Sequence, residues 1–173
     1  DPEAMIKELD EMGVKVMVSI WPSVNIRSVN GPEMKEKGYL LGTNHGADVI
    51  FRFIDTYEEP PVYVHFYDST NAEARQFVWE TAKKNYWDMG VKLFWLDACE
   101  PEINPVQPEN LRFAAGTGLE VGNIYPMLHE KGFYEGMKET GTNEIINLCR
   151  SGWAGSQRYG AAIWSGDIMS DWE

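Results

Sequence analysis

Residues 94–102 have the sequence Phe94-Trp95-Leu96-Asp97-Ala98-Cys99-Glu100-Pro101-Glu102. An apolar run that begins at Val91 stops abruptly at Asp97, and further acids follow within a few residues. In a parallel α/β protein, a buried strand fills the core with apolar side chains and then opens to solvent at its carboxyl end. The stretch therefore predicts a strand that ends at a functional surface, with Asp97 as the first carboxylate that a bound ligand would contact.

A helix, a glycine and an apolar strand follow one another three times along the chain. The helices are expected before Gly13, before Gly90 (72–89) and before Gly141 (125–140). Glycine readily takes the left-handed conformation that closes a helix, and Asp1 and Asn71 are suitable N-caps. Strands are expected at 14–20, 92–96, 144–148 and 161–164. Apolar strands that alternate with helices favour a parallel sheet with right-handed crossovers.

Two long connections, 21–61 and 101–122, are rich in glycine and proline and follow predicted strands. We expect both to be strand-to-helix loops without regular structure of their own. Long ordered loops are usually functional, and in an α/β barrel this face carries the active site.

Composition limits the classes of function. The 173 residues are 43% hydrophobic and suffice for one domain. A net charge of −12 argues against nucleic acid and anionic membranes as partners, and no apolar run is long enough to span a membrane. Cys99 and Cys149 are expected to be free buried thiols. The three histidines lack metal-ligand spacing, so neither a metal nor another cofactor is expected.

Two acids, Asp97 and Asp167, come directly after predicted strand ends. Two carboxylates beside aromatic side chains suit glycoside hydrolysis, in which one acid attacks or stabilises the anomeric centre and the other moves a proton. Tryptophan and tyrosine offer apolar faces on which sugar rings stack. The alternative reading of the residues alone is that one of the acids caps a helix or pairs with Arg150.

Two motifs resemble those of glycoside hydrolase family 31. The string Trp95-Leu96-Asp97-Ala98-Cys99-Glu100 is similar to the nucleophile motif of that family. The later strings are Arg150-Ser151-Gly152-Trp153-Ala154-Gly155-Ser156-Gln157-Arg158-Tyr159-Gly160 and Trp164-Ser165-Gly166-Asp167, which resemble its acid/base region. The motifs occur in the family's order, and the resemblance extends over essentially the whole chain.

The resemblance implies a retaining α-glycosidase on a (β/α)₈ barrel. Asp97 would be the nucleophile, and Asp167 would be the general acid/base. Their environments would have to keep Asp97 ionised and Asp167 protonated at the start of the reaction. Arg150 would keep Asp97 charged or contact a sugar hydroxyl, and the family pattern favours the sugar contact.

The resemblance also assigns supporting roles. Trp95 and Trp164 match positions that line the sugar pocket, and Glu100 matches an acid that orients its neighbours. Trp21 follows the first strand and is either a sugar platform or a core residue.

Four expected strands are half of an eight-stranded barrel. We therefore expect residues 1–173 to be a single segment of a catalytic barrel, truncated at both ends, and inactive alone. Its open sheet edges would favour self-association. The expected substrate is an oligosaccharide or another α-glycoside, with an α-xylosidase-like specificity. An α-glucosidase, a transglycosylase of the same family, and a non-catalytic carbohydrate-binding barrel segment remain as alternatives.

Overall fold

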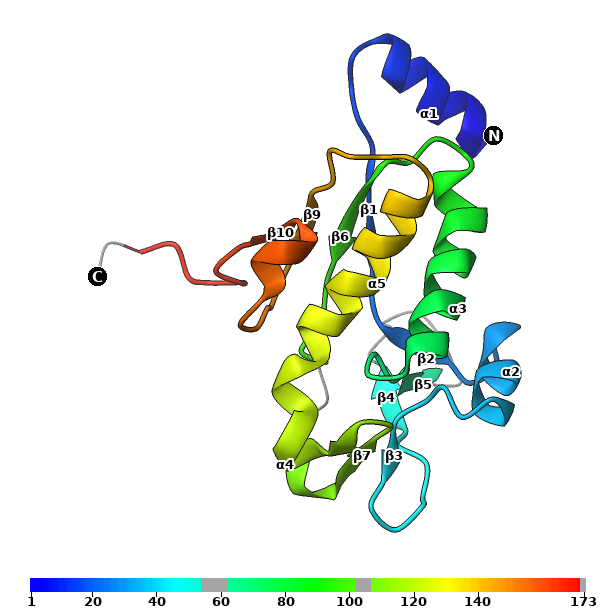
Figure 1. The fold of residues 1–173 in the computed structure, drawn as a ribbon. Coiled ribbons are helices and arrows are strands. Elements are labelled where there is room, and N and C mark those ends of the chain that lie inside the picture. The colour runs from blue at the N-terminus through cyan, green and yellow to red at the C-terminus, as the bar shows by residue number, and fades with distance from the viewer. Residues whose placement is uncertain (54–61, 102–106, 172–173) are drawn as a thin grey trace.

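A parallel four-stranded sheet lies at the centre of the computed structural model, which describes residues 1–53, 62–101 and 107–171 (Figure 1). Its order is β1 (Met17–Ile20), β6 (Leu93–Leu96), β9 (Asn147–Cys149) and β10 (Ala161–Ile163). All three pairings are parallel. The predicted fold class, an α/β partial barrel with four parallel strands, is confirmed. All four strands differ from the predicted bounds. β6 and β10 are each one residue shorter than predicted, β1 begins at Met17 instead of Val14, and β9 covers 147–149 instead of 144–148.

The long helices form where the sequence places them. They are α1 (Pro2–Glu11), α3 (Ala72–Ala82), which continues into the π-helical turn η1 (Lys83–Trp87), and α5 (Tyr125–Glu139). The Asp1 side chain accepts hydrogen bonds from the first amides of α1, and Asn71 does the same for α3. Gly13, Gly90 and Gly141 all have positive φ angles, as the helix-closing role requires.

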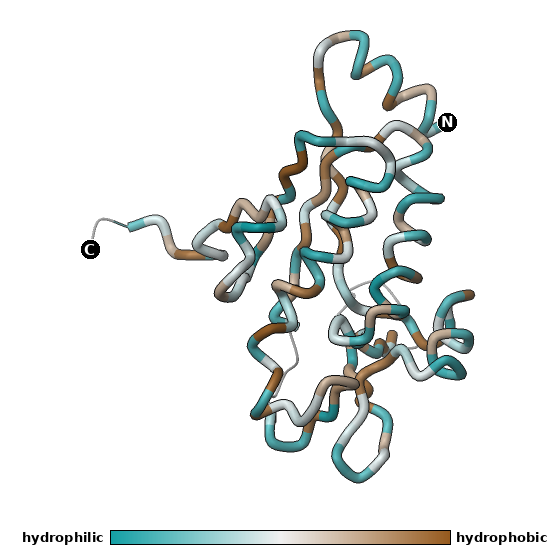
Figure 2. The backbone as a smooth tube through the Cα atoms, viewed as in Figure 1, coloured by the Kyte–Doolittle hydropathy of each residue, from teal (hydrophilic) through white to brown (hydrophobic). Residues whose placement is uncertain are grey.

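The main core lies between the sheet and the two helices α3 and α5, which run side by side along one of its faces (Figure 1). Trp79 of α3 makes edge-to-face contacts with Phe133 of α5 at 5.9 Å and with Phe94 of β6 at 6.2 Å, between ring centroids. Such pairs contribute about 0.5–1.5 kcal/mol each beyond the burial of their area. Figure 2 shows the apolar residues that recur along the central strands beneath these helices. The aromatic cluster thus fixes the helices against the sheet.

The expectation that 21–61 and 101–122 lack regular structure is wrong. Within the described residues, these connections and the strand β5 build two small antiparallel sheets, with the orders β2-β5-β4 and β3-β7-β8. Their elements are β2 (Ser23–Asn25), α2 (Asn30–Glu36), β3 (Gly42–Thr43), β4 (Phe51–Phe53), β5 (Val62–Phe66), η2 (Pro108–Asn110), β7 (Leu111–Phe113), β8 (Gly116–Thr117), α4 (Gly118–Val121) and η3 (Gly122–Ile124). Residues 54–61 and 102–106 of the two connections lie outside the described residues.

Both small sheets lie beyond the end of the central sheet at which its strands finish (Figure 1). Asp68 connects them. One of its carboxylate oxygens accepts hydrogen bonds from the amide and hydroxyl of Thr70, and the other accepts the amide of Ala114 at 2.6 Å. The described parts of the two connections therefore form a structured rim at the carboxyl end of the central sheet.

Gly136 offers a test of the packing between α5 and α3. A Cβ at this position would lie 2.3 Å from Nε1 of Trp79 and 2.4 Å from its Cδ1. We expect Gly136→Ala to destabilise the protein by about 1–3 kcal/mol, although alanine is the better helix former, because the indole cannot move within the packed aromatic cluster. Urea unfolding of the full-length protein measures the change.

Gly122→Ala is the matched control. No atom lies within 4 Å of a Cβ added there, and its backbone is helical, with φ −55°. Its effect should be neutral or stabilising by up to about 1 kcal/mol. Equal effects of the two substitutions would contradict the packing argument.

Candidate active site

The last residues of the four parallel strands form one row across the sheet. Ile20 pairs with Leu96, Leu96 with Cys149, and Cys149 with Ile163. Leu96 and Cys149 are fully buried in the core against the helices. Successive side chains of a strand point to opposite faces. The next residue of each strand therefore faces away from the helices, toward the inner side of the barrel sheet.

These next residues are Trp21, Asp97, Arg150 and Trp164. Main-chain hydrogen bonds continue the ladder through them: the amide of Asp97 donates to Ile20 at 3.0 Å, that of Arg150 to Leu96 at 3.2 Å, and that of Trp164 to Cys149 at 3.4 Å. Four side chains that are far apart in the sequence thus lie together in a single row. We take this row as the base of the candidate site.

Trp95 belongs to the same face, because it lies two residues before Asp97 on β6. Its indole makes an edge-to-face contact with that of Trp164, at 5.5 Å between ring centroids. The indole nitrogen of Trp95 is buried and has no hydrogen-bond partner in the described part of the chain. The two tryptophans form an aromatic wall on one side of Asp97.

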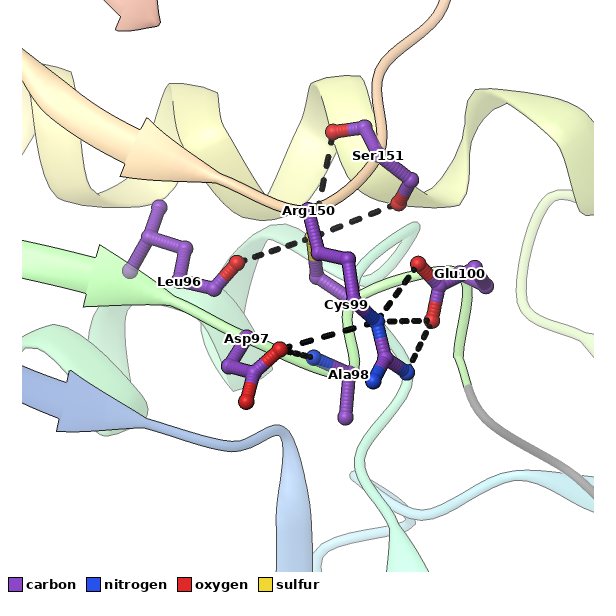
Figure 3. Close-up of polar contacts among 7 residues, drawn as sticks. All are labelled: Leu96, Asp97, Ala98, Cys99, Glu100, Arg150 and Ser151. Carbon is purple, nitrogen blue, oxygen red and sulfur yellow. Dashed lines mark hydrogen bonds and ion pairs between the residues drawn. The ribbon is translucent and has the colours of Figure 1, made fainter. Parts of the chain in front are cut away.

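Arg150 links the two acids of the nucleophile-like motif (Figure 3). Its guanidinium lies 3.5 Å from Oδ1 of Asp97, and its Nη2 donates to Oε2 of Glu100 at 2.6 Å. Nε of Arg150 also contacts both oxygens of Glu100, at 3.1 and 3.2 Å. The side chains of Arg150 and Asp97 are only 18% and 12% exposed, against 40% for Glu100. Of these two acids, Glu100 makes the shorter contacts with the guanidinium, which also lies next to the Asp97 carboxylate.

The ionisation of Glu100 reflects this arrangement. Burial alone would raise its pKa, but the hydrogen bonds and positive charge of Arg150 outweigh burial and lower the pKa below its ordinary value. The Glu100 carboxylate therefore stays charged at neutral pH, and it holds Arg150 in place.

Asp97 has one oxygen engaged and one available. Oδ1 accepts the amide of Ala98 at 2.9 Å and faces Arg150, whereas Oδ2 has no hydrogen-bond partner among the described residues. The residue is 9% exposed. A carboxylate that is anchored through one oxygen and open at the other can present that oxygen to a ligand.

The turn after β6 is tightly constrained. Ala98 has φ +51°, a left-handed conformation that is strained for a residue with a Cβ, and both Ala98 and Cys99 are fully buried. Sγ of Cys99 lies 3.2 Å from the Leu96 carbonyl and 3.3 Å from the Ser151 hydroxyl (Figure 3). Burial raises the pKa of the Cys99 thiol despite its contacts with Ser151. The turns after β6 and β9 are thus packed against each other beneath Arg150.

The prediction of free buried thiols is confirmed for Cys99 and Cys149. The link from Cys99 to Ser151 was not anticipated, because nothing in the sequence shows that the two turns touch.

Trp21 closes the other end of the row. Its ring lies 5.3 Å from that of Phe53 in an edge-to-face contact and 6.0 Å from the guanidinium carbon of Arg150. It is 37% exposed, so a large part of the indole faces outward. This exposure suits a platform more than a core residue.

Asp167 is not brought into this cluster. It lies in the exposed segment after β10, which leaves the body of the domain toward the C-terminus (Figure 1). No hydrogen bond or ion pair joins it to a described residue. Its role as acid/base remains a prediction from the motif alone.

Within residues 1–53, 62–101 and 107–171, no group of three or more His, Cys, Asp or Glu side chains is arranged to hold a metal ion. No helix there is both long and apolar enough to cross a lipid bilayer.

The sheet and the row define one class of protein: a (β/α) barrel whose strand ends carry a carboxylate, an arginine and tryptophans. The profile of the glycosyl hydrolases family 31 TIM-barrel domain matches residues 1–173. The chain belongs to glycoside hydrolase family 31.

The chain is also similar in sequence and structure to individual proteins of this family. The chain is 50% identical over 170 residues to an uncharacterised family 31 glucosidase, ORF2, of Pseudescherichia vulneris, a match that covers 98% of this chain and 31% of that protein. It is 36% identical to alpha-xylosidase A of Aspergillus niger, covering 98% and 25%. The crystal structure of an alpha-xylosidase from a soil metagenome, complexed with xylose, superimposes with a TM-score of 0.91 at 53% identity, covering 99% and 24%. The chain thus spans a third or less of the length of these relatives.

Glu100→Gln tests the arginine clamp. Because the folded pKa of Glu100 is lowered, the stabilisation from its pairing with Arg150 is present above its ordinary pKa and is lost as the pH falls through the folded value. We expect wild type to be more stable than Glu100→Gln at pH 7 and the difference to vanish in acid.

Thermal unfolding of both full-length proteins from pH 7 down to pH 3 measures this difference. Glu33→Gln, which removes the exposed partner of Lys37, is the control and should have little effect. A stability difference between wild type and Glu100→Gln that does not change with pH would contradict the assignment.

Proposed function

We propose that the protein which carries this chain is a retaining α-glycoside hydrolase that works through a covalent glycosyl-enzyme intermediate. The observation that supports this most strongly is the Asp97 carboxylate. It lies at a strand end, anchored through Oδ1 and open at Oδ2, between Arg150 and an aromatic wall. A nucleophile needs this combination of fixed position and free lone pairs.

In the proposed reaction, Oδ2 of Asp97 attacks the anomeric carbon of the sugar. The bond from that carbon to the leaving oxygen breaks, and Asp167 donates its proton to that oxygen. A water molecule then gives a proton back to Asp167 and attacks the anomeric carbon, which releases Asp97 and the free sugar. Two displacements replace one difficult step, and the anomeric configuration is retained.

The other residues of the row position the sugar. Arg150 is held by Glu100 and offers N–H donors to sugar oxygens next to the nucleophile. Trp21, Trp95 and Trp164 present indole faces against which the apolar face of a sugar ring packs. Neither Arg150 nor the tryptophans need to react.

The proposed substrate is an α-xyloside or a related oligosaccharide. Two of the relatives above are alpha-xylosidases, which supports this choice over an α-glucosidase. A transglycosylase would use the same residues and differ only in the acceptor. A non-catalytic carbohydrate-binding segment would bind sugar without turnover, and it would draw support from the exposed position of Asp167.

Two substitutions test the division of roles. Asp97→Asn should lower turnover of 4-nitrophenyl α-xyloside by roughly 10³-fold or more in the full-length protein, because no nucleophile remains. Asp167→Asn should lower turnover of an α-xyloside with an alkyl leaving group by about 10²–10⁴-fold. Its effect on formation of the intermediate from the 4-nitrophenyl substrate should be much smaller, because that leaving group departs without a proton. Full activity of Asp97→Asn would overturn the mechanism.

The sugar preference is tested by kcat/KM for 4-nitrophenyl α-xyloside and α-glucoside under the same conditions. We expect the xyloside to be preferred, because a tight pocket rejects the extra hydroxymethyl group of glucose. One such group is worth about 10- to 200-fold in a close-fitting site. A preference for the glucoside would favour the α-glucosidase alternative.

The isolated chain is proposed to self-associate through its sheet edges. In the described sheet, β1 and β10 are the two edges, and apolar side chains beside them are exposed, including Met17 at 42% and Ile163 at 53%. Unpaired strands of this kind invite pairing with a second chain. Light scattering should give a mass above the 19.7 kDa of one chain. A stable monomer would contradict the proposal.

A further inference from the structure

A further acid lies under the site, on the other side of the sheet. Glu130 of α5 is completely buried, and neither of its carboxyl oxygens has a hydrogen-bond partner of good geometry among the described residues. Buried carboxylates are nearly always paired, because an isolated buried charge is very costly. Neither the core nor the proposed reaction accounts for an acid at this position.

The Glu130 carboxyl faces the elements that carry the arginine loop, residues 150–160. It lies beside the thiol of Cys149, the last residue of β9, and beside the hydroxyl of Ser156 in η4 (Ser156–Tyr159). The Ser156 hydroxyl in turn accepts the amide of Trp153 at 3.0 Å. Glu130 therefore lies beside Cys149, which directly precedes the arginine loop, and beside Ser156 within that loop.

Among the residues that the structure describes, no cation pairs with the carboxyl. The ion pairs among described residues do not include Glu130, and the titratable groups that face it from the sheet are the thiols of Cys149 and Cys99. On its own helix, the neighbouring His129 turns to Tyr67, whose hydroxyl lies 2.6 Å from Nδ1. Arg75 of α3 donates to the carbonyl of Ser69, and Arg158 of η4 donates to that of Gly155. Burial consequently raises the pKa of Glu130 to about 7.

We propose that Glu130 is a positioning residue that controls the arginine loop through its own protonation. In the neutral form, the carboxyl lies beside the Ser156 hydroxyl without a buried charge, and the loop stays packed against α5. When Glu130 ionises, the buried charge must be satisfied by the Ser156 and Cys149 protons or by entering water. Either change shifts Ser156, the amide of Trp153 and the start of the loop at Arg150. The consequence for catalysis rests on the proposed function.

The direct readout is the fluorescence of Trp153, which is 48% exposed in the arginine loop. It is obtained as the difference between the full-length protein and its Trp153→Phe variant, over pH 5–9. We expect this emission to change with a midpoint near pH 7. The change should vanish in Glu130→Gln, which stays neutral at the same size, and in Ser156→Ala, which cuts the link to the loop.

Glu135→Gln is the matched control, since it removes an exposed acid of the same helix that faces Lys131. It should leave the emission change intact. An emission change that persists unaltered in Glu130→Gln would overturn the proposal, and so would loss of the change in Glu135→Gln.

The free energy of unfolding distinguishes the ionisation of Glu130 from its contact with Ser156. Because the pKa of Glu130 is raised, the folded chain keeps a proton that the unfolded chain has lost above about pH 4.5, so this group makes stability fall as the pH rises toward 7. The fall should be smaller in Glu130→Gln and no smaller in Ser156→Ala, where the acid remains buried and loses a hydroxyl that lowers its pKa. An equal fall in all three proteins would count against a buried acid at position 130.

The catalytic readout is KM for 4-nitrophenyl α-xyloside. In wild type it should rise several-fold between pH 6 and 8, with a smaller change in kcat, and this rise should be absent in Glu130→Gln. If both proteins turn over the substrate and KM depends on pH in the same way in both, the positioning role is refuted and the proposed function stands. If wild type turns over no glycoside, the proposed function and this catalytic consequence fail together. The Trp153 emission would still decide whether Glu130 controls the loop.

Discussion

The register of the parallel ladder is the constraint on which the rest of the structure depends. Ile20, Leu96, Cys149 and Ile163 are aligned by main-chain pairing, and the strand pleat then turns the following residue of every strand to the opposite face. Leu96 and Cys149 of this row close the core, and the row that follows forms the site. The site is therefore specified by backbone hydrogen bonds that carry no chemistry of their own.

In the row that forms the site, Arg150 takes part both in the backbone pairing of the sheet and in the contacts between the acids. Its backbone amide extends the ladder to Leu96, and its guanidinium joins Glu100 to Asp97. The shorter contacts go to Glu100, so the arginine is fixed without saturating Asp97. The surrounding turns are equally constrained, through the left-handed Ala98 and the buried contact of Cys99 with Ser151.

Much of this arrangement was predictable from the sequence, for identifiable reasons. The abrupt change from Leu96 to Asp97 marks a strand end correctly, and the glycines with positive φ mark the ends of the long helices. The exact ends of β9 and β10 were not predictable, because pairing with neighbouring strands decides where each strand stops. For β9, this pairing decides whether Cys149 or Arg150 is the first residue beyond the sheet. The short rim strands β2 and β3 form through partners far along the chain, β5 and β7. Glu130 was overlooked because it stands between His129 and Lys131 in a helix of mixed polarity, where only packing reveals its burial.

The single-row geometry has a consequence for how such a chain tolerates insertions and deletions. Losing or gaining one residue inside β6 would turn Leu96 toward the site and Asp97 toward the aromatic core, because each one-residue shift exchanges the two faces of a strand. Losing or gaining one residue in the rim, between β3 and β4, would leave the side chains of the central sheet on their present faces. Length variation is thus tolerated where the chain surrounds the site and prohibited where it builds the site. This asymmetry lets the rim be remodelled for different ligands while the row of four residues remains unchanged.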